Sequence, residues 1–585
     1  MRVVFHWVDE RSGRSLRHPL TFAYMAAFLE YLDFDAQCSY EPDVEGLLAV
    51  NPDVVCILCN SFHYARAVEA AREIKQRRRA KFVLCGPHIS NRPESLDPIF
   101  DVGLVGEPED SLHHVLNVLK STGDLSPEDL RDVPGVVFLE HRTPVVTDPR
   151  ELIDLEMAMP VPRRDILPRS PFPAVVGGRG SPFEDGILGG YVNWGRYRAF
   201  TNGVIAHEIE ELAAEKNAAI LLDDPWLTAD ALRLVDLADL LEDKEVLGTV
   251  QFEAHARAAW VTDEVGEFWV RLNVTRVVLD MIGDLRDPDD LYGARVDLET
   301  LENAIEVCER YEAAVHLFAH VGAPGDDIER IRDLFAFLTE KIAGGILASA
   351  RVGWLPPLPG TRFWDAGVES GVVREPQTDW VAFARLADEP SLEPKLAPHV
   401  PRINLWRKHL QRLEKAFRRP LALFVRDDAD MDIEVDPMAL RSIVFVVEEE
   451  GVSEVLSDDE VKMVRFSLAA LRRDLEKNAA DDDTALVLFA PRPEEVTMED
   501  IRALRLAASL DGVSISRPSS KPFPLLLSVR AALEFDVDTW RAWLAGDEAS
   551  VPPAATPVEF APYLQLPAAD LDQPVPVSEK PREEE

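Results

Sequence analysis

Cysteine is scarce in this chain, because its 585 residues include only five, at positions 38, 56, 59, 85 and 308. Cys56 and Cys59 form a C-x-x-C pair, the spacing of many metal sites. The pair falls, however, in an apolar stretch that predicts a buried strand, where side chains three apart face opposite sides. We interpret both residues as small apolar core residues, since no nearby Cys or His set completes a zinc site.

Long apolar stretches and basic residues are also scarce, and each absence excludes a class of protein. No apolar stretch approaches the roughly 20 residues that cross a bilayer, and the N-terminal strand runs straight into charges, unlike a signal peptide. We therefore expect a cytoplasmic protein without a membrane span. Lys and Arg number 62 against 104 Asp and Glu, which gives an acidic chain with a net charge of −42. Such a charge repels phosphate and excludes nucleic acid and anionic membranes as general partners.

The length exceeds what one hydrophobic core can organise and predicts several domains. Residues 1–125 alternate strand and helix patterns, and the strands are almost continuously apolar. We expect strands at 3–8, 36–40, 54–58, 81–85 and 102–105, and helices at 19–32, 64–77 and 111–119. This alternation is typical of an α/β fold with a doubly wound parallel sheet, whose ligands bind at the carboxyl ends of the strands.

Small and polar residues follow these strands, and glycines among them let a flat ligand approach the backbone closely. The candidate cofactor-binding residues at this edge are Ser61, Gly86, Pro87, His88, Gly106 and Glu107. For His88 by itself, a role in the turn is favoured over a role as a ligand.

The segment CGPHIS at 85–90, followed by FDVGLVGE at 100–107, resembles the cobalamin-binding domain of many radical S-adenosylmethionine (radical SAM) enzymes. Those domains carry G-G-P-H and then D-x-G-V-x-G-E-G-E. Here Cys85 replaces the first glycine, and Glu109 stands at the second glutamate. The D-x-H-x-x-G pattern that supplies a lower axial histidine elsewhere is absent, as is common in this family. The resemblance implies cobalamin as the cofactor of the first domain.

The next segments continue the resemblance. Residues 126–170 are rich in proline and charge and are interpreted as a linker. Residues 171–375 alternate helices and strands again, which suits a full or partial β/α barrel with function on the loops after the strands. The expected helices are 203–216 and 229–241, and the expected strands are 219–222, 250–253, 276–280 and 314–319.

The family places C-x-x-x-C-x-x-C after the first barrel strand, where three thiolates hold an iron–sulfur cluster. The surrounding frame is still legible at 178–188, but the three positions hold Ser181, Asp185 and Leu188. Ser and Asp are hard oxygen ligands poorly matched to a cluster, and Leu cannot ligate. No cysteine between Cys85 and Cys308 substitutes. The sequence therefore predicts no cluster and no radical SAM activity.

A second part of the family's site has also changed. The strand end VLDMIGD at 278–284 lacks the G-I-E-S-like pattern that helps hold S-adenosylmethionine in the family, so we do not expect that cofactor. Segments that shape the fold persist: RAF at 198–200, LDDP at 222–225, GAPGD at 322–326 and LPPLPGT at 355–361 resemble family segments. A scaffold that kept its shape and discarded its reaction is expected to look this way.

Several polar residues have two interpretations each. Asp223 and Asp224 precede a predicted helix, so capping is favoured, with binding of a cation or a substrate amine as the alternative. Glu253, His255 and Arg257 share one face of a strand and either line the barrel or form an internal salt-bridged set. The carboxylates at 184 and 185 are either solvated or a site for a hard metal such as Mg²⁺.

The resemblance ends near residue 375. Residues 403–419 predict a basic amphipathic helix that docks on the protein's own surface rather than on a membrane. Strands at 421–425, 443–447 and 485–489 and helices at 458–476 and 498–509 predict a small α/β domain within residues 376–547. From 548 to 585 the chain is rich in Pro, Ala and acidic residues and is predicted to be disordered.

Three functions remain open at this stage. The favoured one is a cobalamin-binding pseudoenzyme without a cluster, a scaffold for a small-molecule ligand or a partner protein. The second is an enzyme that uses cobalamin alone, for example for methyl transfer. The third is a structural subunit that partners an active, cysteine-containing homologue.

Overall fold

The computed structural model describes residues 1–8, 19–157, 159–170, 172–181, 194–215, 219–281, 297–343 and 347–418, four strands beyond them, and residues 566–571. The chain divides into two compact units. The first comprises Met1–Ala314, Phe318–Asp327 and Val352–Pro398, and the second Val315–Leu317, Ile328–Arg351 and His399–Glu585.

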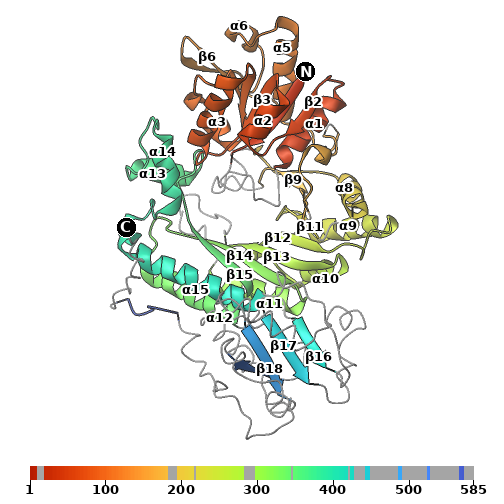
Figure 1. The fold of residues 1–585 in the computed structure, drawn as a ribbon, viewed down its shortest axis with the longest axis vertical. Coiled ribbons are helices and arrows are strands. Elements are labelled where there is room, and N and C mark those ends of the chain that lie inside the picture. The colour runs from red at the N-terminus through yellow and green to blue at the C-terminus, as the bar shows by residue number, and fades with distance from the viewer. Residues whose placement is uncertain are drawn as a thin grey trace. The chain divides into compact units, whose positions relative to one another are not determined.

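The first unit begins with a seven-stranded sheet in the order β2-β1-β3-β4-β5-β6-β7 (Figure 1). Its strands are β1 (Arg2–Trp7), β2 (Gln37–Tyr40), β3 (Val54–Leu58), β4 (Lys81–Cys85), β5 (Val102–Leu104), β6 (Val136–Glu140) and β7 (Thr143–Val146). The first five strands pair in parallel, and β6 and β7 add an antiparallel edge. The predicted parallel sheet is confirmed, and two of its strands come from the segment interpreted as a linker.

Helices cover both faces of this sheet because alternate strand residues point to opposite sides. Phe5 packs in one core with α1 (Leu20–Tyr31) and α5 (Pro108–Thr122), whereas Val4 packs in another with α2 (Val44–Val50) and α3 (Tyr64–Arg77). The strand order makes β1 and β3 the point where the connections reverse direction, so the loops at the carboxyl ends of β1, β3 and β4 are where ligands bind in such folds.

A second sheet has the order β15-β14-β13-β12-β11-β8. Its strands are β8 (Ala174–Val175), β11 (Ile220–Leu222), β12 (Phe252–Arg257), β13 (Val274–Asp280), β14 (Ala314–Val321) and β15 (Leu347–Trp354). The helices that follow its strands are α8 (Asn202–Ala214), α9 (Ala231–Asp243), α10 (Asp263–Arg271), α11 (Leu298–Arg310) and α12 (Ile328–Ala343). β8, β11, β12 and β13 are parallel neighbours. Within the described residues β8 and β15 are the two edges, so these strands form an open sheet rather than a closed barrel.

The chain after the second sheet returns to the first domain. Helices α13 (Arg362–Glu369) and α14 (Trp380–Ala384) contribute Trp364, Trp380 and Phe383 to the core on the α3 side of the first sheet. The ring of Phe383 stacks on that of Phe62, with 5.2 Å between centroids. These aromatic residues fix the loop after β3, which belongs to the candidate ligand edge.

In the second unit, α15 (Val400–Arg418) buries its apolar stripe, and Trp406 lies 5.4 Å from Phe335 of α12 between ring centroids. The predicted docking of this helix on the protein itself is confirmed. Residues 566–571 also lie on α15, since Trp406 Nε1 donates to the carbonyl of Pro567 at 2.7 Å and Arg402 donates to that of Leu571 at 2.9 Å. The prediction of disorder therefore does not hold for these six residues.

The remaining described elements form a four-stranded sheet in the order β16-β17-β18-β19. Its strands are β16 (Ala422–Arg426), β17 (Ser442–Val447), β18 (Ala485–Ala490) and β19 (Phe523–Leu527). The three strands expected here are present, and the helices expected at 458–476 and 498–509 lie outside the described residues. In the described part of the chain, no helix has the length and apolarity to cross a membrane.

Candidate functional site

The candidate cofactor-binding residues lie in three neighbouring loops after β3, β4 and β5. His88 joins two of these loops, because its Nδ1 lies 3.0 Å from Oγ of Ser61 while its Nε2 lies 2.8 Å from Oγ of Ser95. The ring is fully buried and stacks on Tyr64, with 3.8 Å between centroids. Burial lowers the pKa of His88 to about 3, so the imidazole is neutral. Both nitrogens are thus engaged by hydroxyl groups, which gives His88 the geometry of a turn residue.

Two glycines of this edge have different surroundings. Gly86, next to Pro87 at the start of α4 (Pro87–Asn91), has a φ of +105°, and a Cβ on it would lie 2.8 Å from the carbonyl oxygen of Cys59. Gly106 has a φ of +82°, and a Cβ there would meet nothing within 4 Å. Gly86 is therefore required by packing, whereas Gly106 presents bare backbone to open space. Gly106 is therefore the position at which a ligand could approach the backbone of this edge most closely.

Glu107 points into an ion-pair cluster rather than toward that open space. Its Oε1 accepts hydrogen bonds from Arg198 at 2.5 Å and Arg179 at 3.3 Å, and its Oε2 accepts from the backbone N–H of Ile153 at 2.9 Å. Glu109 is fully buried and accepts from Arg179 at 2.6 Å. Burial alone would lower the pKa of Arg179, but the two carboxylates outweigh it and raise that pKa. Both glutamates of the resemblance therefore fasten the first sheet to the segment around Arg179.

That segment contains two short paired strands, in the part of the sequence that resembles the family's cluster loop. Strands β9 (Gly178–Arg179) and β10 (Arg198–Ala199) pair antiparallel, and the N–H of Ser181 donates to the carbonyl of Gly195 at 3.1 Å. Gly180 has a φ of +91°, and a Cβ there would lie 2.4 Å from the carbonyl oxygen of Arg196. Ser181 is buried in this hairpin, and Asp185 and Leu188 lie outside the described residues.

The cysteines of the chain do not fit a [4Fe–4S] cluster. Cluster ligands must be thiolates that reach one cavity. Burial raises the pKa of every cysteine thiol, that of Cys38 to about 11 and that of Cys308 to about 12. Cys56 and Cys85 lie inside the core of the first sheet, and Cys308 lies on α11. None of the five cysteines, all of which lie in the described part of the chain, belongs to β9 or β10.

A second polar site lies at the carboxyl ends of β11, β12 and β13. His255 stands between two carboxylates, with Nδ1 3.2 Å from Oδ1 of Asp223 and Nε2 2.9 Å from Oδ2 of Asp280. Burial by itself lowers the pKa of His255, but the hydrogen bonds and charges of both aspartates outweigh it and raise the pKa to about 9. The ring is therefore an imidazolium at neutral pH and donates a hydrogen bond at each end.

Aromatic rings flank the next residue on this face of β12. The guanidinium of Arg257 lies 4.6 Å from the ring centroid of Trp226 and 5.5 Å from that of Trp260, distances at which a cation is attracted to an aromatic face. Glu253, on the same face, accepts from Arg276 at 2.9 Å. Glu253 and His255 thus form ion pairs with residues outside β12, and Arg257 lies against aromatic rings.

Asp224 and its neighbours correct one prediction from the sequence. The N-cap of α9 is Asp230, whose side chain accepts from the N–H of Arg233, so the prediction that Asp223 and Asp224 cap this helix is wrong. Asp224 instead accepts from the hydroxyl of Tyr197 at 2.7 Å, and burial raises its pKa. Sequence reasoning missed the turn between β11 and α9, which moves the helix start beyond both aspartates.

Four residues of these sites were not singled out as site residues from the sequence: Arg179, Tyr197, Arg198 and Asp280. Each contacts residues far along the chain. Arg179 and Arg198 reach Glu107 across 72 and 91 positions. The one available signal was that Asp280, like Asp223, directly ends a predicted strand of a parallel sheet, which places both at one edge.

The similarity of this chain to known proteins is found in its fold and not in its sequence. No protein-family model and no curated protein matches the chain. It is similar to the radical S-adenosylmethionine methyltransferase TsrM from Kitasatospora setae, in a structure with cobalamin and a [4Fe-4S] cluster bound, with a TM-score of 0.52 and 15% identity over 68% of this chain and 81% of that chain. It is also similar to the cobalamin-dependent S-adenosylmethionine radical enzyme OxsB with aqua-cobalamin and S-adenosylmethionine bound, with a TM-score of 0.54 and 14% identity over 70% and 66%. The chain has the fold of these enzymes.

Proposed function

We propose that this chain is a cobalamin-binding scaffold that carries the fold of radical SAM enzymes without the cluster and without the radical reaction. The observation that carries the proposal is Ser181. It occupies the first cluster position in a hydrogen-bonded hairpin whose neighbouring strand residue, Arg179, is committed to Glu107 and Glu109. A thiolate site would need a different residue at this position and at both following ones.

Cobalamin is supported by the first edge. Gly106 leaves its backbone open to space, and the loops around it are fixed by Gly86, Pro87 and the hydrogen bond between Ser61 and His88. The two solved enzymes of similar fold contain cobalamin. In this proposal Gly106 contacts the cofactor, while Glu107 holds the loop after β5 in place through Arg198.

Loss of the radical reaction is supported by the second edge as well. In the resemblance, residues 278–284 lie where S-adenosylmethionine is held. In this chain Asp280 is instead hydrogen-bonded to His255, which also binds Asp223. The charges of this edge therefore satisfy one another, and the scaffold would take a small molecule or a partner protein without a reaction.

Methyl transfer by cobalamin alone is the second candidate. It is favoured by the mixture of groups on the second edge, where the imidazolium of His255 is 24% exposed and Arg257 lies against two indole rings. Such a surface suits a substrate that has an aromatic ring, which can pack beside the indoles. A structural subunit, with no corrinoid at all, is the remaining alternative.

One experiment separates these functions. The full chain is reconstituted anaerobically with iron, sulfide and hydroxocobalamin, and then analysed for iron, sulfide and cobalt and by absorbance. Cobalt near one per chain with no iron is the expected result. Stoichiometric iron and sulfide would overturn the proposal, and the absence of both metals would leave the structural subunit. With cobalt bound, demethylation of added methylcobalamin by a substrate would identify the methyl-transfer enzyme.

A further inference from the structure

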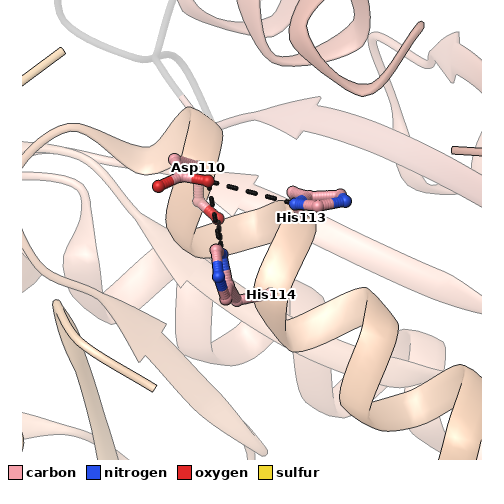
Figure 2. A group of neighbouring side chains, drawn as sticks. All are labelled: Asp110, His113 and His114. Carbon is pink, nitrogen blue, oxygen red and sulfur yellow. Dashed lines mark hydrogen bonds and ion pairs between the residues drawn. The ribbon is translucent and has the colours of Figure 1, made fainter. Parts of the chain in front are cut away.

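Three residues on α5 form a cluster that lies outside both edges described above. Asp110, His113 and His114 follow one another at helical spacings of three and four, so their side chains share one side of the helix. One ligand atom from each lies within 4.8 Å of the others. Figure 2 shows both imidazole rings directed toward the carboxylate of Asp110.

The distances in this cluster match a metal site. Nδ1 of His114 lies 3.3 Å and Nδ1 of His113 lies 3.9 Å from Oδ1 of Asp110. A tetrahedral metal with bonds of about 2.0–2.1 Å separates its ligand atoms by about 3.3–3.4 Å. Of the three pairs of ligand atoms, the pair from Asp110 and His114 already has this separation, and His113 moves closer to both when the metal binds.

The carboxylate of Asp110 divides its two oxygens between different partners. Oδ2 forms an ion pair with Arg150, and Arg150 is itself held by Oγ of Ser111 at 3.0 Å. Oδ1 is the oxygen that faces the imidazoles. The arginine thus orients the carboxylate and leaves a lone-pair position open toward the two rings, which is the role of an outer partner in metal sites.

The ring nitrogen of His113 that faces Asp110, Nδ1, forms no hydrogen bond. This nitrogen is buried, while Nε2 of the same ring lies 2.8 Å from Nδ2 of Asn117. A half-turn of the Asn117 amide presents its oxygen to the N–H of Nε2, the tautomer that frees Nδ1 for a metal. For His114, a metal takes the place of the proton that Nδ1 shares between the backbone carbonyl of Asp110, at 3.0 Å, and Oδ1.

We propose that Asp110, His113 and His114 bind one divalent transition metal of the zinc type, with its remaining coordination positions filled by water. Two imidazoles and one carboxylate suit Zn²⁺, Co²⁺, Ni²⁺ or Cu²⁺, whereas Mg²⁺ and Ca²⁺ require sites made of oxygen. His114 is 46% exposed, which gives the ion a path from solvent. The site uses none of the residues assigned to cobalamin or to the cluster positions.

The test uses Co²⁺ as a spectroscopic probe on the full, reduced chain. We expect one equivalent of Co²⁺ to produce the visible absorption of nitrogen- and oxygen-ligated tetrahedral cobalt, Zn²⁺ to displace it, and Mg²⁺ to have no effect. H114A and H113Q should each weaken binding at least about tenfold. The matched control is H207A on α8, because His207 lies 3.5 Å from Glu210 and 3.8 Å from Glu211 at the same helical spacings. H207A should bind Co²⁺ as the wild type does.

Two outcomes would overturn the proposal: no saturable Co²⁺ binding to the wild type, or equal affinity in the wild type and H114A. The ring of His113 contacts Phe34, with 5.8 Å between centroids, so H113Q also perturbs packing. His114 is exposed, so H114A should not disturb packing in this way. Circular dichroism of H114A with and without Co²⁺ would show whether a loss of binding comes from a loss of folding.

Discussion

The carboxyl edges of the two parallel sheets differ in what their loops contain. Around the first sheet the loops keep glycines with left-handed backbones, and Gly106 faces open space. Around the second sheet the strand ends carry charges that satisfy one another, with His255 between Asp223 and Asp280. One edge therefore leaves a stretch of backbone open to space, whereas the strand ends of the other edge are occupied by its own ion pairs.

The two edges differ because glycines that shape a backbone and side chains that bind a ligand tolerate substitution differently. A glycine at positive φ or against a neighbouring backbone cannot gain a side chain without strain, so it persists as long as the fold does. A ligand side chain is free to change once its ligand is not needed, provided that the remaining buried charges find partners. At the second edge, His255 and Asp280 are partners of this kind.

The largest effect is expected for R179A, which breaks the joint between the first sheet and the cluster-position hairpin. It leaves Glu109, whose side chain is 0% exposed, without its counter-charge, while Glu107 keeps its ion pair with Arg198. Uncompensated buried charge costs about 3–5 kcal/mol, which urea unfolding would measure. The control is R131A, because the Arg131–Glu140 pair is exposed and contributes less than about 1 kcal/mol. Equal losses in both variants would show that the buried cluster does not hold the two segments together.

A smaller effect, about 2 kcal/mol after screening by solvent, is expected from the His255 pair at the second edge. The folded-state pKa of about 9 lies above the ordinary value of 6.5. The stabilisation is therefore complete below pH 6.5 and disappears as the pH rises through 9. Thermal unfolding between pH 6 and pH 10 should show this loss in the wild type and a flatter profile in H255Q. H207Q, at an exposed position, should follow the wild type; a wild-type profile as flat as that of H255Q would contradict the assignment of an imidazolium.

At the first edge, G106A is expected to weaken cobalamin binding by at least tenfold, about 1.4 kcal/mol. The matched control is G123A at the end of α5, because Gly106 and Gly123 have φ values of +82° and +81° and neither Cβ would meet an atom within 4 Å. Both substitutions therefore carry the same backbone strain, and only one lies at the ligand edge. Equal cobalamin affinities in titrations of the two variants would move the cofactor away from this loop.

Much of the first domain is predictable from its sequence. The residues of β3, α3 and β4 coincide with the expected ranges, because each apolar run is bounded by polar residues that cannot be buried. The edge strands β6 and β7 fall in the segment interpreted as a linker, where proline and charge obscure the alternation of a strand. Leu566 was missed for a related reason, because a single apolar residue in a proline-rich tail carries no periodicity.

The site was predictable only in parts. Asp223 and His255 stand out as polar residues at strand ends, but their connection with Asp280 depends on the register between parallel strands. In the register between β12 and β13, Arg257 lies opposite Asp280, and His255 lies two residues before Arg257 on the same face. Nothing local in the sequence specifies that register, and the partners of Glu107 lie still further along the chain.

The smallest effect is expected in the reactivity of the cysteines, because neither edge is expected to contain a reactive thiol. A thiol-specific reagent such as dithionitrobenzoate should find almost no fast-reacting cysteine in the native chain and all five after unfolding, because only the thiolate reacts and burial raises the pKa of each thiol. Cys38, the one cysteine that is not fully buried, should react first but slowly, since its pKa is about 11. Two or three cysteines reacting rapidly together in the native chain would instead indicate thiolates gathered at one place. In that case the contrast between a preserved ligand edge and a discarded cluster site would have to be abandoned.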